Sequence, residues 1–134
     1  MQITVLKSKI HRVTITDCNV NYNGSCAIDS IFLDKAGIHE YEQIHVYNII
    51  NGNRFITYAL CASKGSGIIS LNGAAARLGE VGDLVIICSY GEIHESQINE
   101  HKPKSVYFKK NDSEEWPFPA RFKDRSSVNL LVNP

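Results

Sequence analysis

Short runs of β-branched and aromatic residues, each bounded by a turn signal, recur along the chain at intervals of roughly 8–12 residues. The clearest turn signal is Asn51-Gly52, a dipeptide typical of β-hairpins, which separates a run at 43–50 from a returning run at 54–61. Further strands are expected at 12–16, 68–71, 84–89 and 105–108. Many short strands linked by tight turns predict a mainly β protein, folded as a compact barrel with short helices.

Two segments are predicted to be helical. Residues 30–36 are expected to form a short helix, which Ser30 caps and Gly37 ends. Residues 72–77 are expected to form a loop that opens a single helical turn. Beyond Asn111 the pattern fades, and the two prolines in the segment 116–119 favour an extended chain there.

Composition excludes several classes of protein. With 134 residues the chain has the size of one domain, and a hydrophobic fraction of 43% suffices for a core, which excludes a disordered tail. The chain is too short to hold a dinucleotide-binding domain beside a substrate domain. A net charge of zero lacks the long-range attraction of a strong nucleic-acid binder. No apolar run approaches the ~20 residues of a membrane helix and the first residues do not resemble a signal peptide, so we expect a cytoplasmic protein.

The charges are distributed unevenly. Residues 1–101 carry 7 basic and 10 acidic side chains, whereas residues 102–134 carry 7 and 4. The basic C-terminal segment is most simply a solvated tail, with a contact to another subunit or partner as the alternative. We expect most of the cysteines to be small core residues rather than disulfides, because they are widely spaced without a CxxC pair. They are Cys18, Cys26, Cys61 and Cys88.

The sequence lacks several familiar catalytic and metal-binding motifs. Its five histidines include no pair at i and i+4, so no metal site is expected. Neither a phosphate-binding P-loop nor the Gly-x-Ser-x-Gly motif of serine hydrolases occurs.

Two short segments carry side chains suited to chemistry. In the run at 54–61, Arg54 and Tyr58 fall on one face of a strand, where they either converge on one ligand or form an exposed pair. Thr57 falls on the opposite face, so either a bulge redirects it or it acts elsewhere, at a nearby turn or a subunit interface. Gly24-Ser25 is either a simple turn or a bond whose carbonyl is open to attack by the Ser25 hydroxyl.

Five sequence blocks, taken in order over about residues 1–110, closely resemble the pyruvoyl-dependent aspartate 1-decarboxylase family. The blocks are Lys9-Ile10-His11-Arg12, Asn21-Tyr22-Asn23-Gly24-Ser25, Asn51-Gly52-Asn53-Arg54-Phe55-Ile56-Thr57-Tyr58, Asn72-Gly73-Ala74-Ala75-Ala76 and Gly82-Asp83-Leu84-Val85-Ile86-Ile87.

The resemblance implies a double-psi β-barrel over residues 1–110, followed by a tail at 111–134 whose role it leaves open. It also implies a homotetramer that converts L-aspartate to β-alanine and carbon dioxide for pantothenate, and hence coenzyme A, biosynthesis. The precursor is expected to cleave itself between Gly24 and Ser25 into a β chain of residues 1–24 and an α chain of residues 25–134. Some members of the family need a maturation factor for this step.

By the same resemblance, the cofactor is a pyruvoyl group that forms from Ser25 and replaces pyridoxal phosphate, with no metal. Its ketone takes the amino group of aspartate as a Schiff base and accepts the electrons that the departing carboxylate leaves on Cα. Tyr58 matches the family's proton donor, and Thr57 matches a position for substrate binding and processing. The further matched substrate-binding positions are Lys9, Arg54, Gly73, Ala74 and Ala75. The residues expected to support the site or the cleavage are His11, Tyr22 and Asn72.

The cations Arg54 and Lys9 are expected to hold the carboxylate that the product keeps. Pairing the departing carboxylate would stabilise the ground state more than the transition state, in which its charge is neutralised. A departure from the family is Asn19, which stands where many relatives carry an acid, so that processing could differ. Two alternatives remain open at this point: a non-catalytic barrel that binds a partner, and a pyruvoyl decarboxylase for another small amino acid.

Overall fold

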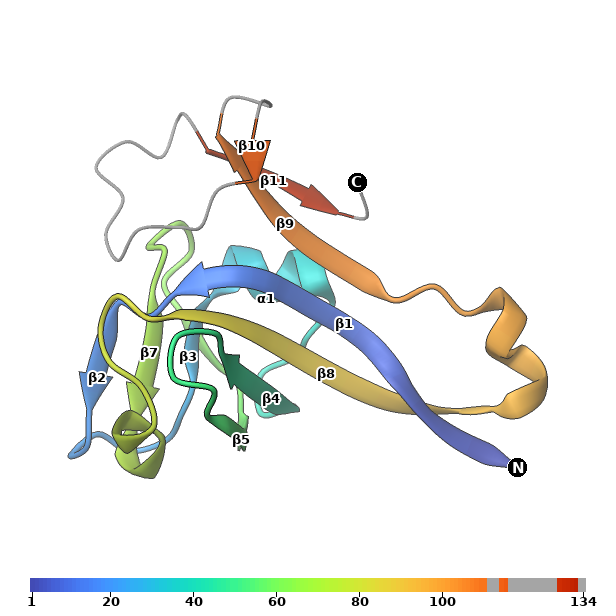
Figure 1. The fold of residues 1–134 in the computed structure, drawn as a ribbon, viewed down its shortest axis with the longest axis horizontal. Coiled ribbons are helices and arrows are strands. Elements are labelled where there is room, and N and C mark those ends of the chain that lie inside the picture. The colour runs from blue at the N-terminus through green and yellow to red at the C-terminus, as the bar shows by residue number, and fades with distance from the viewer. Residues whose placement is uncertain (111–113, 116–127, 133–134) are drawn as a thin grey trace.

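Two β-sheets dominate the computed structural model, which describes residues 1–110, 114–115 and 128–132. Within these residues the larger sheet has seven strands, in the order β10-β9-β1-β8-β4-β5 with β11 also paired to β9 (Figure 1). The smaller sheet has four, in the order β2-β7-β3-β6. The strands are β1 (Gln2–Thr14), β2 (Asp17–Asn19), β3 (Ala27–Asp29), β4 (Gln43–Asn48), β5 (Arg54–Tyr58), β6 (Leu60–Ala62), β7 (Ile69–Asn72), β8 (Leu84–His94), β9 (Lys104–Lys110), β10 (Glu114–Glu115) and β11 (Val128–Val132). The helices are α1 (Ser30–Ala36) and the 3-10 turns η1 (Gly73–Arg77) and η2 (Glu95–Glu100).

The predicted class, a mainly β barrel with short helices, is confirmed. Parallel pairs join β1 to β9, β2 to β7 and β3 to β6, although several other neighbours are antiparallel. Parallel neighbours cannot be joined by a tight hairpin and require crossing connections, as a double-psi barrel has.

The antiparallel strands β1 and β8 run side by side through the molecule (Figure 1). They contain 13 and 11 residues, so both extend far beyond the predicted runs at 12–16 and 84–89. Their outer ends alternate between half-buried and exposed positions, which weakens the apolar signal there. A register shift between Ile10 and Val13 marks an irregularity in β1.

The predicted hairpin at Asn51-Gly52 is confirmed, since β4 and β5 pair antiparallel on either side of it. Strand β4 ends at Asn48, before the predicted end at Ile50. The Asn48 side-chain oxygen accepts hydrogen bonds from the backbone N–H groups of Ile50 and Asn51, at 2.9 and 3.2 Å, and so begins the turn.

The prediction of one continuous strand over 54–61 is wrong. The run divides at Ala59 into β5 and β6, which belong to different sheets. The buried Ala59 donates its N–H to the Glu42 carbonyl and accepts from the Tyr41 N–H. These partners come from a segment outside both sheets, so tertiary contacts cause a break that the local sequence does not signal.

Helix α1 has the predicted bounds, and Gly37 ends it in the left-handed conformation with φ 68°. The expected cap at Ser30 is wrong, because the preceding Asp29 caps the helix by accepting from the Ile31 N–H at 2.9 Å. The same buried carboxylate accepts from the N–H groups of Gly65 and Gly67 at 3.0 and 2.8 Å. Three N–H donors compensate the cost of burying the Asp29 carboxylate. This network explains why Asp29 rather than Ser30 caps the helix. The predicted helical turn at 72–77 is confirmed as η1.

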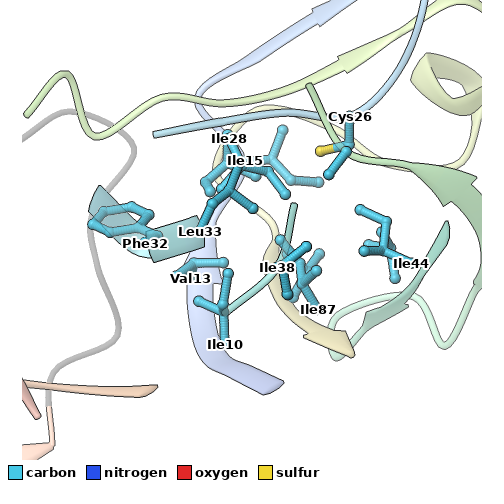
Figure 2. Packing of buried hydrophobic residues seen from close by; sticks show 14 of the residues in the cluster. Ile10, Val13, Ile15, Cys26, Ile28, Phe32, Leu33, Ile38, Ile44 and Ile87 are labelled. Carbon is cyan, nitrogen blue, oxygen red and sulfur yellow. The ribbon is translucent and has the colours of Figure 1, made fainter. Parts of the chain in front are cut away.

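The hydrophobic core combines side chains of both sheets and of α1 (Figure 2). From α1, Phe32 packs edge-on against Phe108 of β9 with ring centroids 5.1 Å apart. Full burial of one large apolar side chain contributes about 1.5–3 kcal/mol. The largest fully buried side chains are Phe108, Ile10, Ile15, Ile28, Leu33, Ile44, Ile69, Leu71, Ile87, Val13, Val46 and Val85.

The cysteines are free, and most follow the prediction. Cys26 and Cys88 are buried, and Cys18 packs partly buried against the core, but Cys61 is exposed. Cys61 differs because it lies on β6, where its backbone N–H bonds the surface carboxylate of Glu40 at 2.9 Å.

The described part of the chain contains no helix long and apolar enough to cross a membrane. Its side chains also include no group of three or more His, Cys, Asp or Glu that could hold a metal ion. The predicted extended segment at 116–119 lies outside the described residues. For most residues of the basic segment at 102–134, the side chains are not described either.

Candidate active site

The Gly24-Ser25 turn lies against the end of β5, where backbone hydrogen bonds hold it. The Tyr58 N–H donates to the Ser25 carbonyl at 3.2 Å, and the Tyr58 carbonyl accepts from the Cys26 N–H. The Leu60 N–H donates to the Cys26 carbonyl at 2.9 Å, and this pairing continues into the β3–β6 ladder. Ser25 is therefore fixed relative to the side chains at the end of β5.

Ser25 and Thr57 form a hydroxyl pair at this junction. Their side-chain oxygens lie 2.6 Å apart, and the Thr57 hydroxyl donates to the Ser25 carbonyl oxygen at 2.7 Å. Thr57 has only one hydroxyl proton, so the proton between the two side chains belongs to Ser25 and points at Thr57. Ser25 is buried, with a relative exposure of 7%, and Thr57 is partly buried. Of the alternatives open for Thr57, the structure places it at the Gly24-Ser25 turn.

The backbone at Gly24 leaves no room for a side chain. Its φ is 73°, and an added Cβ would lie 2.8 Å from both the Tyr58 hydroxyl oxygen and Leu60 Cδ1. A glycine is required for this conformation and for the close approach of Tyr58. The Tyr58 hydroxyl thus lies beside the bond between residues 24 and 25.

A cavity of about 310 Å³ opens at this turn. One wall is β5 and the other is η1 with its flanking residues. Gly73 has φ 63°, and the Tyr22 carbonyl oxygen would lie 3.4 Å from a Cβ there, so the two loops meet closely. The lining residues are Gly24, Ser25, Phe55, Ile56, Thr57, Tyr58, Asn72, Gly73, Ala74, Ala75 and Leu78.

The amide of Asn72 is oriented by a buried neighbour. The Ser70 hydroxyl donates to Asn72 Oδ1 at 2.8 Å, and both residues are buried. This contact fixes the orientation of the amide and leaves its N–H₂ group to offer a partner in the cavity. Asn72 can therefore donate a hydrogen bond beside Ser25.

The predicted cations lie on an open face of the larger sheet. The Arg54 guanidinium carbon is 3.7 Å from the centre of the Tyr47 ring, and the Tyr47 hydroxyl is 2.6 Å from the Tyr90 hydroxyl. Lys9 Nζ lies 5.6 Å from the centre of the Tyr107 ring, and the His11 ring lies 5.2 Å from the same ring. We name Lys9, Tyr47, Arg54, Cys88 and Tyr90 the cation face.

The structure therefore brings together only part of the predicted set. Ser25, Thr57, Tyr58, Asn72 and the segment 73–75 line one cavity. Lys9, His11 and Arg54 do not line it, and the Tyr22 side chain is exposed while its carbonyl meets Gly73. Arg54 and Tyr58 share a face of β5, as predicted, but within one chain they do not line the same cavity.

Burial shifts the pKa of groups next to the Ser25 cavity and on the cation face. It raises the pKa of the Cys26 thiol to about 12, so the neighbour of Ser25 stays protonated at neutral pH and does not compete as a nucleophile. Burial likewise raises the pKa of the Cys88 thiol, although Lys9 and Arg54 partly oppose this. Burial and the hydrogen bond with Tyr47 raise the pKa of the Tyr90 phenol.

Several residues of this arrangement were not anticipated. Ser70 shares the parity of Asn72 on one strand, and that spacing could have indicated their contact. Leu78 and the pair Tyr47–Tyr90 join the site through contacts between distant segments, for which the sequence carries no local signal.

Comparisons with known proteins match most of the chain. The family model described as aspartate decarboxylase matches residues 1–115. An aspartate 1-decarboxylase of Hydrogenovibrio crunogenus is 58% identical over 108 residues, which cover 81% of this chain and 84% of that protein. One from Methylococcus capsulatus is 54% identical over 112 residues, covering 84% and 89%. Among solved structures, the computationally designed protein msDPBB_sym2 is 15% identical with a TM-score of 0.39, covering 65% of this chain and 96% of that one.

Proposed function

The chain belongs to the aspartate decarboxylase family, and from this premise we propose its function. The protein removes the α-carboxylate of L-aspartate and releases β-alanine and carbon dioxide, which supplies pantothenate and hence coenzyme A biosynthesis. The observation that carries the proposal is the Ser25 hydroxyl, held at 2.6 Å from Thr57 in a glycine turn that opens on a cavity.

The first step uses only groups of the chain itself. Ser25 Oγ bonds to the Gly24 carbonyl carbon and the peptide C–N bond breaks, so the amide becomes an ester and residue 25 gains a free amine. Thr57 accepts the hydrogen bond from the Ser25 hydroxyl and so orients it for this attack. Elimination then removes the proton from Cα of residue 25, breaks the Cβ–Oγ bond and releases the Gly24 carboxylate, leaving dehydroalanine. Water replaces its nitrogen, ammonia leaves, and a pyruvoyl group remains at the start of the chain 25–134.

The surroundings of residue 25 fit a pyruvoyl group. The position is shielded, with 7% relative exposure, and the side chains of Ala74 and Ala75 on the opposite wall are small. When present, the group supplies a ketone that binds the substrate amine and withdraws the electrons freed by the departing carboxylate. The Tyr58 hydroxyl lies against Gly24, the neighbour of residue 25, and from this place it can return a proton to the substrate carbon. The amide of Asn72 offers a donor at the same cavity.

Arg54 and Lys9 hold the carboxylate that the product keeps. Stacking on Tyr47 leaves the edge of the Arg54 guanidinium open to a carboxylate. The two cations lie on the cation face rather than in the cavity of the same chain, which supports an assembly in which another copy completes the site. We propose that this assembly is the homotetramer that the family resemblance implies. A complex with a substrate analogue in which both cations bind the departing carboxylate would refute this assignment. We place the enzyme in the cytoplasm and leave room for a maturation factor in the cleavage.

Mass spectrometry tests the proposal directly. Purified protein should give masses for residues 1–24 and 25–134, and borohydride with L-aspartate should trap the substrate on the longer chain. Ser25→Ala should remain a single chain and trap nothing. A wild-type chain that stays whole after prolonged warming, with and without a cell extract as the source of a maturation factor, would contradict the proposal.

A further inference from the structure

The walls of the Ser25 cavity come from different parts of the chain. Residues 55–58 of β5 line one side, and Leu78, directly after η1, lines the other. In the described residues β5 is the last strand of its sheet. At the Ser25 end, the pairing of β3 with both β6 and β7 joins the two walls, whereas toward the β4–β5 turn their spacing comes from other contacts.

Two side-chain amides of the β4–β5 hairpin join these walls. Nδ2 of Asn51 and Nδ2 of Asn53 both donate to the backbone carbonyl oxygen of Leu78, at 3.1 and 3.0 Å. One carbonyl oxygen accepts two hydrogen bonds, so both of its lone pairs are used. Asn51 Oδ1 also accepts from the Asn53 N–H at 2.8 Å, which fixes the orientation of the Asn51 amide. We name Asn51 and Asn53 the amide clamp.

Both ends of the amide clamp are themselves anchored. On the Leu78 side, an added Cβ at the next residue, Gly79, would lie 2.8 Å from Ile15 Cδ1 and 2.9 Å from Leu71 Cδ1, so the chain is pressed against the core there. On the hairpin side, Asn48 begins the turn and donates through Nδ2 to Asp83 Oδ2 at 2.8 Å. Each segment is thus held at one point, and the amide clamp fixes the spacing of the two segments beyond these points.

From these contacts we propose that Asn51 and Asn53 are positioning residues that set the width of the Ser25 cavity and thereby select the length of the substrate. The proposal rests on the proposed function. Neither residue lines the cavity, so the clamp acts through Leu78 and through the strand that follows Asn53. A cavity of fixed width favours a four-carbon dicarboxylic amino acid over its five-carbon homologue, and rejection of one extra methylene is worth about 10- to 200-fold.

The test compares kcat/KM for L-aspartate and L-glutamate, measured as carbon dioxide release by the cleaved enzyme. In the variant Asn51→Ala/Asn53→Ala, kcat/KM for aspartate should fall and that for glutamate should fall less or rise. The aspartate-to-glutamate ratio should drop about 5- to 10-fold, as expected for the loss of two hydrogen bonds. Asn53→Gln, which keeps a donor, should retain more of the ratio than Asn53→Ala. Asn99→Ala, on the exposed η2, is the matched control and should leave the ratio unchanged.

Each other outcome counts against the amide clamp. A double variant in which both substrates lose activity equally overturns it, because the role is then only structural. A variant that melts at the wild-type temperature but is not cleaved overturns it too, since the clamp then serves the cleavage. If the double variant does not fold, Asn53→Ala carries the test with an expected change of about threefold, near one weak hydrogen bond. Wild-type protein that releases no carbon dioxide from aspartate would instead refute the proposed function itself.

Discussion

The Gly24-Ser25 turn and the cation face hold their polar groups in opposite ways. At the turn, Ser25 is buried and its hydroxyl and carbonyl both bond Thr57, at 2.6 and 2.7 Å. On the cation face, Arg54 is exposed and rests on an aromatic ring. The first arrangement fixes atoms that must react with one another, and the second leaves charged donors ready for a ligand. Substitutions at the Gly24-Ser25 turn should therefore impair the cleavage, whereas substitutions on the cation face should weaken substrate binding.

The largest expected effect is at the turn. Thr57→Val removes the hydroxyl that orients Ser25 but keeps the β-branched shape. Loss of the hydrogen bond that orients the nucleophile should slow the cleavage by about 100-fold or more. The measurement is the rate at which the full-length mass disappears. Thr57→Ser should restore most of the rate, and a Thr57→Val protein that cleaves at the wild-type rate would remove Thr57 from the step.

On the cation face, Arg54→Ala should leave the cleavage unchanged but weaken binding of aspartate. A hydrogen bond to a charged group is worth about 1.5–3 kcal/mol, so KM should rise about 10- to 100-fold. Steady-state kinetics and intact mass on one preparation separate the two effects. An Arg54→Ala protein with impaired cleavage and a normal KM would contradict the assignment of cleavage to the turn and of substrate binding to the cation face.

A smaller effect is expected at the pair of Ser70 and Asn72, because Asn72 lines the same cavity as the Gly24-Ser25 turn. Ser70→Ala frees the amide oxygen of Asn72, so the amide can rotate and present the wrong group to the cavity. One neutral hydrogen bond is worth about 0.5–1.5 kcal/mol, so kcat/KM should fall about 2- to 10-fold. A Ser70→Thr variant keeps the hydroxyl and should lose less. Equal losses in both variants would assign Ser70 to packing alone.

The smallest effect is expected at Lys7, which lies two residues before Lys9. Among the described residues Lys7, unlike Lys9, forms an ion pair within the chain. Lys7 Nζ contacts both carboxylate oxygens of Glu42, at 2.8 and 2.9 Å. Burial disfavours ionisation of Glu42, but the bonds from Lys7 and from the His39 N–H outweigh it and lower the pKa of that carboxyl. Lys7→Gln should reduce the free energy of unfolding at neutral pH by about 0.5 kcal/mol, as for partly exposed pairs.

The pH dependence of the Lys7–Glu42 pair follows from the lowered pKa. The stabilisation is complete above the ordinary carboxyl pKa of 4.5 and is lost as the pH falls through the lower folded value. The difference between wild type and Lys7→Gln should therefore narrow below pH 4.5. Denaturant unfolding at neutral and acid pH measures it, and a difference that stays constant would exclude the ion pair as its cause.

Much of the fold follows from local patterns along the chain. The hairpin at Asn51-Gly52, the helix over 30–36 and the turn at 73–77 depend on neighbouring residues, and all are present. Among the site residues, the resemblance named Ser25, Thr57, Tyr58, Asn72 and the loop 73–75, and these line one cavity. Their roles in the reaction remain predictions.

What local patterns could not supply are contacts between distant segments. The break at Ala59, the cap at Asp29 and the clamp on Leu78 each depend on partners that folding alone brings near. The amino-acid order determines which side chains can react and which face of a strand each occupies, because covalent geometry fixes the alternation. Only the tertiary structure decides that Thr57 meets Ser25 while Arg54 rests on Tyr47, because neighbours across space depend on how the sheets pack.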